Sequence, residues 1–196
     1  MKSRFDRFPF DPSRWPFFYG WAMIPLATMG MLMSVPGQTM GVSAFTDPLL
    51  GALEISRVRL TTAYMFGTIA SSLVLPFAGR AYDRFGARFL ALCSCLGLGA
   101  ILLILSAADR VAHGTAALMP AMNPGLVAAG VMTAGFFLLR FFGQGVLTMS
   151  SKNMLMQWFE RRRGLANGCM GIFVALGFSL APRILDDLIR RVGWDG

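Results

Sequence analysis

Five long runs without a charged side chain divide the amino-acid sequence. They cover residues 15–46, 60–79, 89–108, 111–139 and 164–182, and the shortest has 19 residues. A helix of about 20 apolar residues crosses the roughly 30 Å hydrocarbon core of a bilayer. A loop cannot cross, because lipid offers no partners for its backbone N–H and C=O groups. The runs therefore predict an all-α membrane protein.

The fourth run predicts a loop followed by a span. Residues 110–124 hold His113, Gly114, two prolines and Asn123, a composition typical of a loop. The first run is too long for a cleaved signal peptide and is expected to stay in the membrane. The transmembrane bundle is thus expected over 17–184, with spans near residues 18–45, 58–80, 88–108, 125–149 and 164–184.

The composition excludes other common classes of chain. Hydrophobic residues make up 55% of the sequence and charged residues 14%, against about 25% charged residues in a typical soluble protein. This hydrophobicity excludes a disordered chain, and three cysteines are too few for a disulfide scaffold. The net charge is +8, but the basic residues flank apolar runs instead of forming a patch on a soluble domain, which argues against nucleic-acid binding.

The basic residues gather on one side of the predicted membrane. The N-terminal tail and the connections after the second and fourth spans hold eleven basic and four acidic residues, whereas the other side holds six of each. Because Lys and Arg concentrate in cytoplasmic loops, we expect a multi-pass protein of the cell (inner) membrane. Residues 1–16 would form a cytoplasmic tail and 185–196 an extracytoplasmic segment. The eleven basic residues are Lys2, Arg4, Arg7, Arg14, Arg80, Arg84, Arg88, Lys152, Arg161, Arg162 and Arg163.

The connection between the second and third spans carries a distinctive motif. Its sequence is Gly-Arg-Ala-Tyr-Asp-Arg-Phe-Gly-Ala-Arg over residues 79–88. A glycine can allow close helix approach or supply a turn conformation that other residues resist, and the aspartate can pair with the surrounding arginines. This motif resembles the cytoplasmic loop of the major facilitator superfamily. The resemblance implies that Gly79, Asp83, Arg84, Gly86 and Arg88 help to gate the conformational change.

Three further segments resemble the same family. They are Arg-Phe-Phe-Gly-Gln-Gly over residues 140–145, in which the glycines come one residue earlier than in the family pattern, the segment 158–168, and Phe-Tyr-Gly-Trp over residues 18–21. The last two are similar to the monocarboxylate and oxalate–formate branch. The resemblance implies a carrier that works by alternating access, either facilitative or coupled to protons or another ion, with two bundles of six helices around a central site.

The chain resembles the N-terminal bundle of that family. Its fold class is expected to be five transmembrane helices of a six-helix bundle, ending before the sixth, with residues 191–196 similar to the lead-in to that helix. The implied partners are the lipid bilayer, a small solute and a C-terminal helical bundle on the same or another chain. The alternative is a non-transporting membrane protein, either a truncated carrier remnant or a partner subunit.

Polar side chains recur on the inner faces predicted for three spans. The first span contains the helix-breaking pair at residues 36 and 37, and interrupted helices often mark binding sites. Ser and Thr at membrane depth also serve as helix-packing hydrogen bonds, and this alternative stays open. The candidate substrate-binding residues are Arg140, Gln144, Gln38, Tyr64 and Thr68.

Arg140 is the most informative of these residues. It lies near the centre of its predicted span, where a charge costs at least about 2.5–3.5 kcal/mol, and no Asp or Glu lies inside any predicted span. Its partner could be backbone carbonyls, a carboxylate from another bundle, or an anionic substrate. We hypothesise a small organic anion such as a carboxylate, oriented by Gln38, Tyr64 and Gln144.

The sequence offers no pattern for a metal, a cofactor or catalysis. His113 is a single loop histidine without ligand partners at metal spacing, and the three cysteines are expected to be small packing residues. Phosphate-cradling loops, catalytic triads and paired carboxylates are not found. We therefore expect a protein that is not an enzyme.

Overall fold

The computed structural model describes residues 18, 20–118, 122–159 and 161–193, and the tail predicted over 1–16 lies outside them. The described chain is helical throughout, with no strand. This confirms the predicted fold class. The elements are α1 (Gly20–Met33), the 3-10 turn η3 (Val35–Gly37), α2 (Thr39–Ala44), α3 (Thr46–Leu53), α4 (Arg57–Ser106), α5 (Ala108–Leu118), α6 (Pro124–Leu139), the π-helical segment η4 (Arg140–Leu147), α7 (Thr148–Trp158) and α8 (Arg163–Val192).

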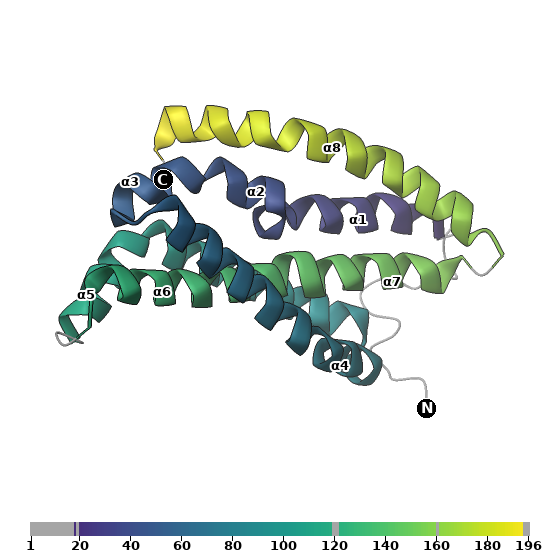
Figure 1. Ribbon diagram of the computed structural model, residues 1–196. Coiled ribbons are helices and arrows are strands. Elements are labelled where there is room, and N and C mark those ends of the chain that lie inside the picture. The colour runs from purple at the N-terminus through teal and green to yellow at the C-terminus, as the bar shows by residue number, and fades with distance from the viewer. Residues whose placement is uncertain (1–17, 19, 119–121, 160, 194–196) are drawn as a thin grey trace.

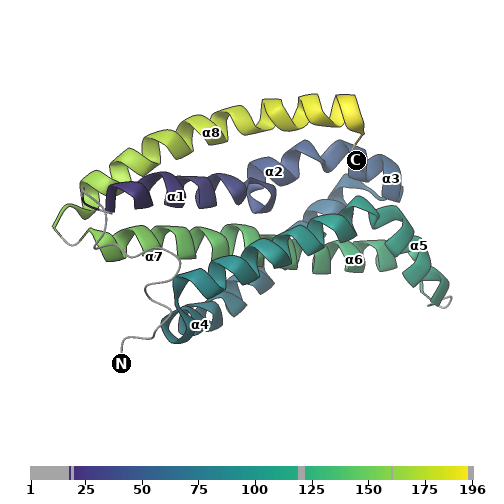
Figure 2. The ribbon, with the colours of Figure 1, turned by 180° about the vertical axis from the view of Figure 1, so that it is seen from behind.

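The helices run roughly along one common direction and form a layered bundle (Figure 1). α8 packs against α1 and α2, α1 packs against α7, and α4 packs against α6 and η4. α6, η4 and α7 form one continuous helix, Pro124–Trp158, which we call the 124–158 rod. Seen from behind, α8, the α1–α2 line and the rod keep the same order (Figure 2).

Different segments lie at the two ends of the bundle. The bend in the middle of α4, the start of α1 and the connection from α7 to α8 lie together at one end, which we call the hinge end (Figures 1 and 2). α3, α5 and the last turns of α8 lie at the other end, which we call the α3 end. The connections that follow the predicted second and fourth spans therefore lie at the same end of the bundle.

Gly86 bends α4 back on itself. Its backbone has φ 82° and ψ 169°, and it is the one non-helical residue inside Arg57–Ser106. This combination of angles is open essentially only to glycine. The turn was expected in residues 79–88. The first half of α4 continues to residue 85, beyond the predicted limit of 80. The second half starts at residue 87, one residue before the predicted limit of 88.

The loop predicted over 110–124 is wrong for its first half, because α5 covers Ala108–Leu118. Four of the eleven residues of α5 are alanine, the strongest helix former, and Asp109 lies in its first turn, where a negative charge is favourable. Single Gly and His residues do not outweigh these preferences. Asn123 then caps α6 by accepting a hydrogen bond from the Gly125 N–H at 2.9 Å.

The remaining predicted spans are present with different limits. The span expected over 18–45 is divided among α1, η3 and α2. The rod continues beyond 149 to Trp158, and α8 continues beyond 184 to Val192, so most of the segment 185–196 is helical. Three helices in the described chain are long and apolar enough to cross a membrane, Arg57–Ser106, Pro124–Trp158 and Arg163–Arg191, and Gly20–Met33 is a shorter apolar helix.

Apolar side chains fill the contacts between helices and also cover much of the outer surface. Ala27, Leu155 and Ala166 are almost completely buried where α1, α7 and α8 meet. At the hinge end, Phe159 is packed edge-on against Phe18 and Trp21, with ring centroids 5.5 and 5.8 Å apart. Large apolar side chains nevertheless remain exposed on α4 and α8, as expected where lipid is the solvent.

We predict that Gly86→Ala destabilises the protein by about 1–3 kcal/mol, because alanine resists the backbone angles found there. Gly79→Ala is the matched control: a Cβ at Gly79 would meet no atom within 4 Å, and alanine favours a helix. Thermal unfolding of the purified protein in detergent measures both. Equal melting temperatures for the two variants would contradict the assignment of the bend to Gly86.

Candidate functional site

The first span is broken where the sequence predicts it. α1 ends at Met33, and Val35–Gly37 forms the short turn η3 with Pro36 at its start. Gly37 lies against the rod so closely that a Cβ would come within 2.6 Å of the Leu139 carbonyl oxygen and 2.7 Å of the Gly143 Cα. The break therefore touches the middle of the rod through backbone atoms, a contact that only glycine permits on this side.

The rod is itself irregular at this contact. η4 (Arg140–Leu147) is π-helical. This conformation is rare in proteins, and where it occurs it is frequently at a functional site. The Ser94 hydroxyl donates a hydrogen bond to the Phe142 carbonyl, and a Cβ at Gly97 would lie 2.8 Å from the Phe142 ring. α4 thus also contacts the irregular turn. A π-helix was not expected from the sequence. The only local signal for it is the weak helix preference of Gly143 and Gly145 within residues 140–147.

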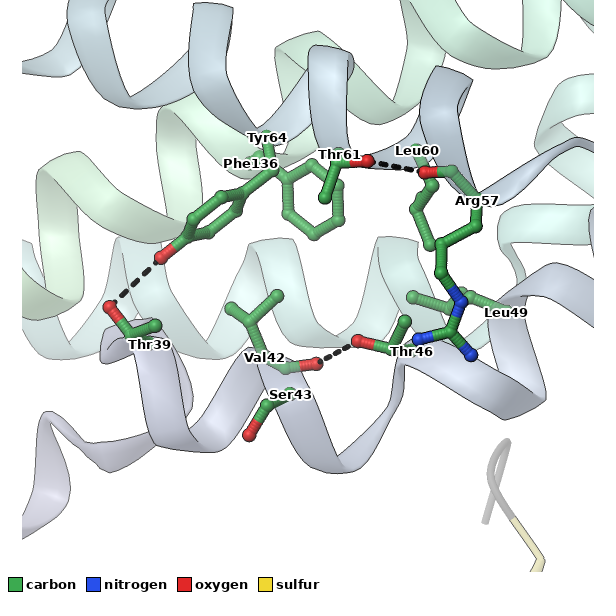
Figure 3. A pocket seen from close by; sticks show the side chains of 10 residues that line it. All are labelled: Thr39, Val42, Ser43, Thr46, Leu49, Arg57, Leu60, Thr61, Tyr64 and Phe136. Atoms are coloured by element: carbon green, nitrogen blue, oxygen red, sulfur yellow. Dashed lines mark hydrogen bonds between the residues drawn. The ribbon is translucent and has the colours of Figure 1, made fainter.

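Arg140, Tyr64 and Thr39 form a hydrogen-bonded triangle. Arg140 Nη1 donates to the Tyr64 hydroxyl at 2.6 Å and to the Thr39 hydroxyl at 3.1 Å. The Tyr64 hydroxyl donates to Thr39 Oγ1 at 3.1 Å, as Figure 3 shows. The guanidinium carbon also lies 5.1 Å from the centre of the Tyr64 ring. Three helices therefore converge on this group: α2 provides Thr39, α4 provides Tyr64 and the rod provides Arg140.

The charge of Arg140 has no anionic partner within the described part of the chain. Its hydrogen-bond acceptors are the two hydroxyl groups, and no salt bridge or backbone carbonyl joins it. Both hydrogen bonds use Nη1, so the N–H groups of Nε and Nη2 make no contact with these residues. Arg140 lies at the middle of the Pro124–Trp158 helix, where an unpaired charge is costly.

Gln38 and Gln144 flank the triangle. Gln38 Nε2 donates to the Ser34 hydroxyl at 3.0 Å and weakly to the Thr148 hydroxyl at 3.4 Å, which links the broken first span to the rod. The Gln144 Oε1 atom is buried, with no hydrogen-bond partner in the described chain. Such an acceptor has a free-energy cost of about 1–3 kcal/mol when it stays unpaired.

Thr68 is not drawn into this group. Its hydroxyl donates to the Tyr64 carbonyl at 2.8 Å, a hydrogen bond within α4 and not between helices. Thr39 was not among the predicted substrate-binding residues, although it directly follows the break at 36–37. The break at residues 36 and 37 is the signal that could have identified Thr39, because residues next to an interrupted helix often belong to the same binding site.

A pocket of about 160 Å³ adjoins the triangle. Figure 3 shows its side chains converging from α2, α3, α4 and α6. Tyr64 and Phe136 pack edge-to-face, with ring centroids 5.4 Å apart, and form one boundary. The full lining is Thr39, Val42, Ser43, Thr46, Leu49, Arg57, Leu60, Thr61, Tyr64 and Phe136.

The motif over 79–88 lies at the hinge end. Gly79 has open space around it, so it does not provide the expected close approach within the described chain. Asp83 and Arg84 are exposed, and the salt bridges found between described residues do not include Asp83. Arg88 is also exposed.

Tyr82 fixes this motif to the rod. Its side chain is buried, and its hydroxyl accepts a hydrogen bond from Gln157 Nε2 at 3.2 Å. Burial, assisted by the negative charge of Asp83, raises the pKa of the Tyr82 hydroxyl above its ordinary value. The hydroxyl stays protonated at neutral pH, so this contact does not depend on pH in the physiological range.

A group of three or more His, Cys, Asp or Glu side chains that could hold a metal ion does not occur among the described residues. Cys93 and Cys95 are exposed and Cys169 is half-buried. These two cysteines on α4 are therefore not the buried packing residues that the sequence suggested.

An apolar helical bundle with an interrupted first span and a polar group at mid-helix is characteristic of a membrane protein. The Major Facilitator Superfamily model matches residues 28–196. The chain belongs to this family of transporters.

Two curated relatives match the chain. It is 26% identical over 95% of its length to "MFS-type transporter 1" of Ophiocordyceps sp. (strain BCC 1869), and covers 38% of that protein. It is 29% identical over 74% of its length to "Uncharacterized 38 kDa protein in 23S RNA operon" of Thermoproteus tenax, and covers 33% of it. The chain thus spans about a third of the length of these relatives. No solved structure gives a significant match.

We predict that Gly37→Ala destabilises the protein by about 1–3 kcal/mol, because its Cβ would press on backbone atoms of the rod that cannot rotate away. Gly51→Ala in α3 is the matched control, since a Cβ there meets no atom within 4 Å. Thermal unfolding in detergent compares the two. A Gly37→Ala protein as stable as the control would contradict the backbone contact between η3 and η4.

Proposed function

We propose that this chain supplies the N-terminal bundle of a secondary active or facilitative transporter for a small organic anion such as a carboxylate. The observation that carries the proposal is the arrangement of Arg140. Its positive charge lies at mid-helix, its Nη1 is held by Tyr64 and Thr39, and an anionic partner is not present among the described residues.

A carboxylate matches the groups that Arg140 leaves available. The planar guanidinium binds a carboxylate through two parallel N–H groups, and Nη2 and Nε present such a pair. The two hydrogen bonds of Nη1 fix the direction in which that pair points. This preorganisation reduces the conformational entropy lost on binding.

The neighbouring groups suit the rest of a small solute. The pocket of about 160 Å³ is below the roughly 300–1,000 Å³ typical for drug-sized ligands, and its lining is mixed hydroxyl and apolar. In this proposal the unpaired Gln144 Oε1 accepts a hydrogen bond from a solute hydroxyl, Gln38 holds the broken span in place, and Thr68 supports Tyr64.

Transport would follow from alternating access between this bundle and a second one. We propose that the hinge end faces the cytoplasm of the cell that carries the protein in its plasma membrane, with the N-terminus on that side. The exposed Asp83, Arg84 and Arg88 would then contact the second bundle in one of the two conformations and release it in the other. Gly86 keeps the motif in its turn.

We predict that Arg140→Gln raises the KM for an anionic substrate by about 10- to 100-fold, the loss expected for a hydrogen bond to a charged group. Tyr64→Phe keeps the ring but removes the hydroxyl, and we expect a smaller increase of a few-fold. Uptake of labelled lactate, pyruvate, oxalate and formate into proteoliposomes that contain the full-length protein measures both effects. Imposed pH gradients test proton coupling in the same vesicles.

Arg110→Gln is the control, because Arg110 is an exposed arginine on α5, away from the pocket lining. Unchanged carboxylate affinity in Arg140→Gln would overturn the substrate assignment. Uptake of none of the four carboxylates by the unmodified protein would favour a non-transporting protein or a different class of solute.

A further inference from the structure

Another arginine, Arg57, lines the same pocket as Tyr64 but on the other side of it. Arg57 is the first residue of α4, and Tyr64 lies seven residues later on that helix. Seven residues of α-helix correspond to about 10 Å. Figure 3 shows the Arg57 side chain at one side of the pocket and Tyr64 with Thr39 at the other. Arg57 therefore lines the same small cavity as Tyr64 and Thr39, the two hydrogen-bond partners of Arg140.

Arg57 is paired, but weakly. Its Nη2 contacts the Asp47 carboxylate of α3 at 2.6 Å, and the two side chains are 67% and 80% exposed. Exposed ion pairs contribute little to stability. An anion that arrives from solution can therefore replace Asp47 on Arg57 with little loss.

The route between the two arginines carries no negative charge. The pocket lining contains hydroxyl and apolar side chains but no carboxylate. The Thr46 hydroxyl donates to the Val42 carbonyl of α2, and the Thr61 hydroxyl donates to the Arg57 carbonyl of its own helix. A hydroxyl can rotate to donate to a passing anion instead. An anion that leaves Arg57 thus meets no like charge before it reaches the triangle.

From this arrangement we propose that Arg57 is a receiving site for the anionic substrate at the α3 end of the pocket, and that Asp47 occupies it as an internal competitor until substrate arrives. The inference rests on the proposed function, because it names the route to the same Arg140 site. It adds an access side, a second anion-binding residue and a residue that lowers affinity.

A receiving site and a purely structural ion pair predict different changes in substrate affinity when Asp47 or Arg57 is replaced. If the Asp47–Arg57 pair only holds α3 to α4, removing either partner breaks the same contact and the two variants behave alike. If Asp47 competes with substrate for Arg57, removing the carboxylate frees the arginine and removing the arginine eliminates the site. The two single variants must then change the affinity in opposite directions.

The experiment measures carboxylate uptake into proteoliposomes that contain the full-length protein, using whichever of lactate, pyruvate, oxalate and formate shows saturable transport. We expect Arg57→Gln to raise the KM and Asp47→Asn to lower it, each by up to about 5-fold, the value of a surface ion pair. The double variant should match Arg57→Gln, and Arg57→Lys should retain most of the affinity. The difference between the single variants should shrink at high salt, because salt screens exposed charges.

Asp186→Asn and Arg190→Gln are matched controls, because they break an equally exposed ion pair of 3.0 Å on α8 that does not line the pocket. Both should leave the KM unchanged. Vesicles of defined orientation add a second readout, since the effects of Asp47 and Arg57 should appear for uptake from the α3 face.

The outcomes separate this inference from the function on which it depends. If Arg140→Gln impairs uptake while Arg57→Gln and Asp47→Asn shift the KM in the same direction, or not at all, the receiving site is overturned and the central site stands. If Arg140→Gln has no effect on carboxylate uptake, the proposed substrate class itself fails. Thermal unfolding of each variant confirms that a changed KM does not reflect misfolding.

Discussion

Every backbone polar group inside a bilayer must find its partner within the protein, and this constraint governs the centre of the structure. Regular helix meets it automatically, and irregular backbone is tolerated only against other protein. Here the two irregular segments, η3 and η4, lie against each other through Gly37 and Gly143. Ser94 satisfies the Phe142 carbonyl from α4. The polar triangle forms at one end of each segment. Thr39 comes after η3, and Arg140 is the first residue of η4.

Arg57 of the pocket and Arg140 beside it differ in their electrostatic environment. Arg140 is half-buried and held by hydroxyls and an aromatic ring, so its charge keeps a strong field in a medium of low dielectric constant. Arg57 is exposed and already has a carboxylate beside it, so solvent weakens its field. A solute that travels from Arg57 toward Arg140 would therefore move from weak to strong attraction.

The sequence predicted those features that depend on local composition. Charge-free runs located the membrane helices, and the glycine in the 79–88 motif located the turn that Gly86 makes. Pro36 and Gly37 located the break in the first span. The sequence placed Arg140 and Tyr64 in one candidate site, but the hydrogen bond between them was not expected: the partners considered for Arg140 were backbone carbonyls, a carboxylate or an anionic substrate.

Other features depend on contacts between distant segments. The π-helix at 140–147 needs Gly37 and Ser94, which are far away in sequence, so no local pattern predicts it. Thr68 shares a helix face with Tyr64, but whether its hydroxyl turns to a solute or to its own backbone is set by its surroundings. α5 was missed because isolated Gly and His residues were given more weight than the alanines around them.

The turn at Gly86 also restricts how the bundle can move. A single residue joins the two halves of α4, so there is no length of connecting chain to take up a relative displacement between them. The hydrogen bond from Gln157 to Tyr82 then ties this tight hairpin to the rod that carries Arg140. Any movement of the bundle must therefore carry the hairpin and the rod together, as one unit that extends from the 79–88 motif to Arg140.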